Sequence, residues 1–172
     1  MHKKAFITAL LLLPLAIGCN QDSGSQVSTV DQQYLLDAQP DASSTPTEIK
    51  DAVKGAEGPI SVTLVGRVGA PGGIDPFIQG QANFLVSEMA DESHANGDPD
   101  HESKCQFCAN KLKNAPRVVV QFKNDQGTVV KTDSRKLLGI ESGSVVYIEG
   151  QATYDAVLDR VMIDGESIFI KS

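Results

Sequence analysis

The sequence predicts a mainly β domain in which five or six short strands close into a small barrel. Three observations support this fold class. Apolar residues alternate with polar ones in several short runs, as they do in half-buried strands. Two of these runs contain an interior glycine, Gly66 or Gly150, and such a glycine lets a strand coil around the corner of a barrel. The helix signals are short: one precedes the first strand and another lies between the third and the fourth.

The chain begins with the pattern of an export signal. Lys3 and Lys4 precede an apolar run over residues 5–17. This run is too short to span a bilayer comfortably and is typical of the apolar core of a signal peptide. The sequence therefore predicts export from the cytoplasm.

The signal ends in a small residue directly before a cysteine, Gly18 and Cys19. This ending resembles the lipobox of bacterial lipoproteins, although Ala16 stands where that family usually has Leu, Val or Ile. The resemblance implies that residues 1–18 are a lipoprotein signal peptide and that Cys19 is lipidated. An ordinary secretory signal with an incidental Cys19 is the alternative.

Lipidation would anchor the chain in the cell envelope, facing the periplasm, because more than one acyl chain gives stable attachment. Asn20 occupies the position of the aspartate that retains enterobacterial lipoproteins in the inner membrane, which favours the outer membrane. Residues 19–44 are rich in Ser, Gln, Asp and Thr and are expected to form a lipidated, flexible tether. An ordered arm docked through Tyr34 and Leu35 is the alternative for this segment.

The folded domain is expected to span residues 45–172 and to begin with a short helix. Thr45, Pro46 and Glu48 fit a capping box with proline at the first helical position. Apolar residues then recur at helical spacing until Gly55 and Gly58 end the helix.

Strands follow this helix along the rest of the chain. The expected strands are 60–68, 81–88, 117–122 and 144–153, completed by strand pieces at 160–164 and 167–170. Residues 128–131 can pair back on the third strand after a turn at Gly127. A short helix is expected at 134–138, ended by Gly139.

Four of these segments carry a family resemblance. They are Val65–Val68, Val118–Phe122 with the turn at Gly127, the helix at 134–138, and Ser142–Gly150. Together they resemble OB-fold domains of the tRNA-anticodon and helicase type over about residues 60–170, with a small β-sandwich as the alternative. The resemblance implies ligand binding on the barrel face or by its loops, without naming the ligand.

The composition disfavours nucleic acid as that ligand. The formal net charge is -7 and the chain has no tryptophan. OB domains that bind single strands use a basic groove with aromatic platforms, which this composition does not favour.

Residues 88–113 show neither a strand nor a helix period and are predicted to form a long loop inserted between the second and third strands. The loop contains His94, His101, Cys105 and Cys108. Two thiolates and two imidazoles can form a tetrahedral metal site, with zinc as the default ion and copper(I) as the other choice.

Two further interpretations of Cys105 and Cys108 stay open. The pair can form a disulfide, which persists in an oxidising compartment, or act as a redox-active pair. Ala109 stands where c-type haem attachment requires histidine, and the β-rich context differs from the strand-to-helix setting of a thioredoxin site.

From the sequence alone we therefore expect a non-enzymatic, membrane-anchored binding module outside the cytoplasm. It would display a His/Cys loop that binds a metal ion or is closed by a disulfide, with an envelope protein as the expected partner. The alternative is an envelope thiol-disulfide or metal-transfer protein that uses Cys105 and Cys108.

Overall fold

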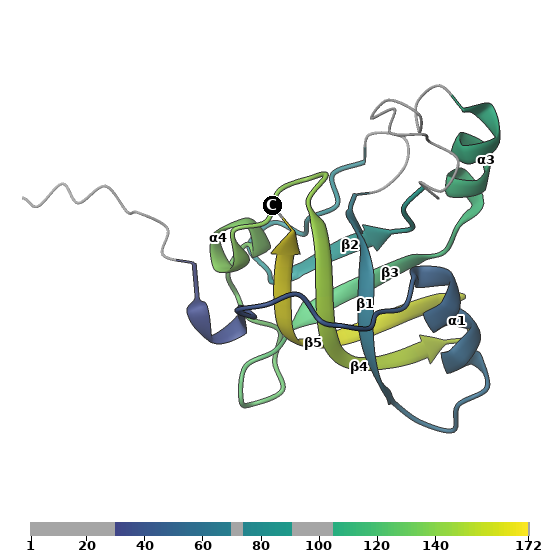
Figure 1. Cartoon of the computed structure of the whole chain (residues 1–172). Coiled ribbons are helices and arrows are strands. Elements are labelled where there is room, and N and C mark those ends of the chain that lie inside the picture. The colour runs from purple at the N-terminus through teal and green to yellow at the C-terminus, as the bar shows by residue number, and fades with distance from the viewer. Residues whose placement is uncertain (1–29, 70–73, 91–104, 172) are drawn as a thin grey trace, which may run out of the picture.

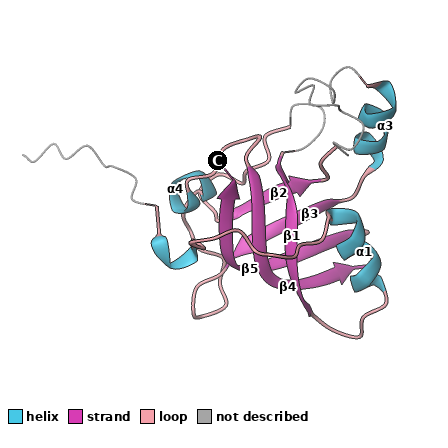
Figure 2. Ribbon diagram, in the orientation of Figure 1, coloured by secondary structure: helices cyan, strands magenta, loops and turns pink. Residues whose placement is uncertain are grey.

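A computed structural model describes residues 30–69, 74–90 and 105–171 of the chain (Figures 1 and 2). Within these residues the strands are β1 (Ile60–Val68), β2 (Asn83–Ser87), β3 (Arg117–Phe122), β4 (Val145–Asp155) and β5 (Arg160–Lys171). The helices are α1 (Pro46–Lys54), α3 (Gln106–Asn114) and α4 (Ser134–Leu138), with a 3-10 turn, η1 (Gln32–Tyr34), before them.

The five strands of the described chain form one sheet that closes on itself in a ring. The strand order is β1-β2-β3-β5-β4, and β4 pairs with β1, which closes the ring. Neighbouring strands are antiparallel except β3 and β5, which are parallel. The predicted mainly β fold is confirmed, as are the two short helices at 46–54 and 134–138. A single closed sheet also differs from the sandwich alternative, which needs two sheets.

The core lies inside the ring because the strands turn alternate residues inward. The inward residues are fully buried and include Leu64, Val68, Phe84, Val86, Val118, Val120, Phe122, Ile148, Ile163 and Ile168. Helix α1 adds Ile49 and Val53 to the same cluster. The predicted capping box is present, since the Glu48 N–H donates to Thr45 Oγ1 at 3.3 Å and the Thr45 N–H donates to Glu48 Oε2 at 2.8 Å.

Residues 30–44 form an arm that lies against the ring. Tyr34 meets the Phe122 ring edge-on, with the ring centroids 5.2 Å apart. Leu35 bridges to Ile168 of β5, and the arm then crosses the outer face of β5 and β4 to bridge at Ser44 with Leu64 of β1 (Figure 1). This part of the expected tether is therefore ordered through Tyr34 and Leu35. Residues 19–29 lie outside the described chain.

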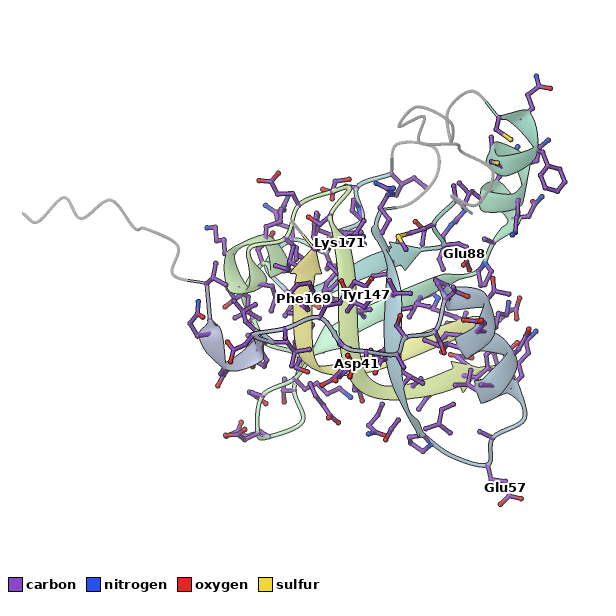
Figure 3. All side chains as sticks on the ribbon, viewed as in Figure 1. Asp41, Glu57, Glu88, Tyr147, Phe169 and Lys171 are labelled. Carbon is purple, nitrogen blue, oxygen red and sulfur yellow. The ribbon has the colours of Figure 1, made fainter. Side chains whose placement is uncertain are left out.

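The arm crosses a face of the ring on which two aromatic side chains stand side by side. Tyr147 of β4 and Phe169 of β5 are paired in register, with ring centroids 6.1 Å apart (Figure 3). Tyr147 is buried although it points away from the core. One outer face of the ring is thus already occupied by the protein's own chain.

Helix α4 is held by polar contacts at its start and apolar contacts along its length. Asp133 caps the helix and accepts hydrogen bonds from the Arg135 side chain, which lower the pKa of Asp133 to about 2. Leu137 and Leu138 are buried in the core. Gly139 ends the helix with a φ of 74°, as predicted.

Two expectations about local structure were wrong. The end of the predicted irregular loop is the helix α3, and the two predicted strand pieces after residue 160 are one strand, β5. The second difference has a clear cause: β5 stays paired with β4 throughout, and the register shift at Glu149 and Gly150 absorbs the irregularity. No helix among the described residues is long and apolar enough to cross a membrane.

Candidate functional site

The structure describes two of the four residues predicted to bind a metal ion. Cys105 and Cys108 lie at the start of α3, a helix that projects from the ring beyond β2 and β3 (Figure 1). His94 and His101 lie outside the described residues, and so does the predicted lipidation site Cys19.

Cys105 is the N-cap of α3. Its Sγ accepts a hydrogen bond from the Cys108 N–H at 3.2 Å. Cys105 is half-buried, whereas Cys108 is only 6% exposed. The side-chain hydrogen bond with Cys108 lowers the pKa of Cys105, and backbone hydrogen bonds from Cys108 and Phe107 lower it further. Cys105 therefore loses its proton to form the thiolate more readily than an ordinary cysteine does.

This arrangement suits either metal ligation or thiol chemistry, because the thiolate is the reactive species in both. Within the described ranges, no three His, Cys, Asp or Glu side chains come together as a metal site. The metal site, the disulfide and the redox pair all stay predictions.

A second candidate site lies on the outer face of β2, β3 and β5, on the part of the ring that the arm leaves open. It is a groove of about 760 Å³ between the end of α3 and the β4–β5 turn. The strands contribute Asn83, Leu85, Arg117, Val119, Arg160 and Met162, and the connecting segments contribute Asp75–Ile78, Lys113–Pro116, Leu158 and Asp159. Lys50 of α1 completes the lining.

The floor of the groove is apolar because three outward positions in register carry apolar side chains. Leu85 pairs with Val119, and Val119 pairs with Met162, so the three lie in one row across β2, β3 and β5. Outward positions of a half-buried sheet are usually polar. Val119 is only 8% exposed and Leu85 and Met162 are half-buried, so the row presents a narrow apolar strip at the bottom of the groove.

One end of the groove is cationic. Arg117 and Arg160 lie two residues before Val119 and Met162, so their side chains point outward on the same face. The two arginines therefore form the row next to the apolar floor. Lys113 lies at the end of α3 on the same side. Within the described chain, no carboxylate forms an ion pair with these three side chains.

Among the described residues, the two carboxylates of the β4–β5 turn, Asp155 and Asp159, already have partners of their own. Asp159 pairs with Lys50 at 2.8 Å and accepts a hydrogen bond from the Tyr154 hydroxyl, and these two contacts lower the pKa of Asp159. Asp155 Oδ1 accepts hydrogen bonds from the N–H groups of Val157 and Leu158, and these bonds close the β4–β5 turn. The turn is thereby held against α1, with Leu158 at the rim of the groove.

Exposed apolar side chains gather around this groove. Ile78 is 47% exposed and Leu158 is 57% exposed, and both line the groove. Val157, which is 93% exposed, directly precedes Leu158. An apolar floor with an apolar rim and a cationic end can bind a ligand that is both apolar and anionic.

Sequence reasoning missed the groove, although one signal was present. Val119 and Met162 are apolar at positions where the alternation of their strands calls for an outward, polar residue. Only the pairing of β3 with β5 shows that they are neighbours, and that pairing joins segments far apart in the chain.

Comparisons with known proteins add no relative: the chain matches no protein-family model, and no curated protein is significantly similar to it.

Proposed function

We propose that this chain is a membrane-anchored, extracytoplasmic binding module built on an OB-like barrel, and that its ligand binds in the groove over β2, β3 and β5. The groove carries the proposal, because it combines an apolar floor with Arg117 and Arg160 on a chain whose net charge is -7. The strand order and the position of α4 between β3 and β4 support the OB-like assignment.

The proposed anchor is Cys19, the lipobox cysteine. The first described residue, Val30, comes eleven residues later, and an extended chain of that length reaches at most ~40 Å. With the arm ordered from residue 30, the anchor would keep the domain close to the membrane surface. The outer membrane, facing the periplasm, is the proposed location.

Labelling with radioactive palmitate tests the anchor. We expect the full chain to incorporate label and to fractionate with membranes, and the Cys19→Ser variant to lose both properties. The Cys105→Ser variant serves as the matched control and should keep the label. Label that persists in Cys19→Ser would overturn the proposed anchor.

An envelope thiol-disulfide or metal-transfer protein is the second candidate function. The lowered pKa of Cys105 favours it, because a thiolate is needed both to bind zinc or copper(I) and to attack a disulfide. His94 and His101 are the proposed additional ligands. A disulfide between Cys105 and Cys108 remains the competing proposal for the pair.

Metal content and thiol titration of the full chain, purified without chelator, separate these alternatives. One bound metal per chain, with both α3 thiols reacting only after the metal is removed, supports the metal site. Absence of metal together with unreactive thiols at Cys105 and Cys108 supports the disulfide. In either case a Cys105→Ser, Cys108→Ser double variant should stay folded, because α3 projects from the ring.

A further inference from the structure

We propose that the groove binds an acidic segment of another polypeptide in extended conformation, with acidic side chains alternating with apolar ones. This inference rests on the proposed function as a binding module and names the class of partner. It follows from charge, spacing and position.

Charge favours an acidic partner. Lys113, Arg117 and Arg160 face the groove without a carboxylate partner among the described residues, while the chain as a whole is acidic. Asp75, the acidic lining residue outside the turn, accepts the Phe77 N–H at 3.0 Å. A carboxylate entering the groove would therefore meet cations that form no ion pair with any described carboxylate.

Spacing favours an extended polypeptide. The cationic row and the apolar row are two residues apart along β3 and β5, a separation of about 7 Å in a strand. Side chains on one face of an extended peptide repeat at the same interval. If an acidic residue of the bound peptide lies beside Arg117 and Arg160, the side chain two residues further along that peptide would lie over Val119 and Met162.

Nucleic acid fits the groove less well. Phe77 is the aromatic residue among the described lining residues, and it is 9% exposed, beneath the Arg135 guanidinium at 4.8 Å from its ring centroid. Among the described lining residues, a single strand would find no exposed aromatic ring on which its bases could stack. The apolar floor offers contacts to aliphatic side chains instead.

The position of the groove favours a protein, rather than the anchoring membrane, as its binding partner. The described chain begins at η1, and η1 and α4 lie at the opposite end of the ring from α3 and the β4–β5 turn (Figure 1). The groove therefore opens at the end of the ring away from η1, where the described chain begins. A periplasmic protein segment can reach this end.

Fluorescence anisotropy with labelled peptides tests the proposal on the full chain in detergent. The probe is a short peptide in which glutamate alternates with valine, compared with the peptides in which lysine or serine replaces glutamate, and with single-stranded oligothymidylate. We expect the glutamate peptide to bind, and to bind more weakly as ionic strength rises. The lysine and serine peptides should bind at least about tenfold more weakly.

Variants assign the binding to the groove. Arg117→Gln with Arg160→Gln should weaken binding of the glutamate peptide by about tenfold or more. Lys171→Gln is the matched control: Lys171 is exposed at the end of β5, on the face that carries Tyr147 and Phe169 (Figure 3), and its loss should leave affinity unchanged. Thermal unfolding should confirm that all three substitutions leave the fold intact.

Four outcomes would overturn the inference. Equal binding of the glutamate and lysine peptides would show that charge does not select the ligand. Unchanged affinity in the double arginine variant would show that the peptide does not bind in this groove. Arginine-dependent binding of oligothymidylate alone would make the ligand a nucleic acid. Binding of the serine peptide as tightly as the glutamate peptide, weakened by Leu158→Ser, would reject the acidic class while leaving the binding module in place.

Discussion

Replacing Phe122 by alanine is expected to lower the free energy of unfolding by about 3–5 kcal/mol. Phe122 is fully buried and stacks on Phe84, with ring centroids 6.4 Å apart and planes inclined at 11°. Its second aromatic contact is with Tyr34, so the substitution would also remove an aromatic contact that holds the arm to the ring. Denaturant unfolding of the full chain in detergent measures the effect.

Phe107 provides the control for this substitution. It is 74% exposed on α3, so Phe107→Ala deletes the same atoms without opening a cavity and should change stability by less than about 0.5 kcal/mol. Equal losses at the two positions, or a loss below about 1 kcal/mol at Phe122, would contradict the described core.

Replacing Gly150 by alanine is expected to cost about 3 kcal/mol, because the added methyl group has no space. An ideal Cβ at Gly150 would stand 2.3 Å from the carbonyl oxygen of Asp164 and 3.0 Å from Cα of Gly165. Both atoms belong to the backbone of β5, so relief requires the two strands to move apart at their register shift. The loss should be visible as a lower midpoint of thermal unfolding.

Gly58→Ala is the matched control, since no atom lies within 4 Å of its ideal Cβ. We expect this variant to unfold within about 0.5 kcal/mol of the parent chain. A Gly150→Ala variant as stable as Gly58→Ala would show that β4 and β5 do not approach as closely as described.

Local patterns in the sequence predict much of the ring. The bounds of β1 and β3 follow from alternation, and α1 and α4 follow from capping residues and Gly139, because these signals act between near neighbours in the chain. The helix α3 was missed because its cap is a cysteine, which is not a usual capping residue. Lys111 and Lys113 in its last turn were the available signal.

Features that depend on distant pairing could not be predicted. The arm was expected to be flexible because it contains little apolar surface, yet Tyr34 reaches Phe122 and Leu35 reaches Ile168. The groove needs the parallel pairing of β3 with β5, which no local pattern encodes. For the predicted His/Cys site, the structure adds the geometry of Cys105 and Cys108 alone.

The most direct test of the proposed binding site is the NMR spectrum of the full chain labelled with carbon-13 at its methionine methyl groups. Met162 lies on the floor of the groove, and Met89 lies beyond the end of β2, outside the groove lining. On addition of the glutamate-valine peptide, we predict that the Met162 resonance shifts and saturates while the Met89 resonance stays in place. An unchanged Met162 resonance with bound peptide would contradict the account.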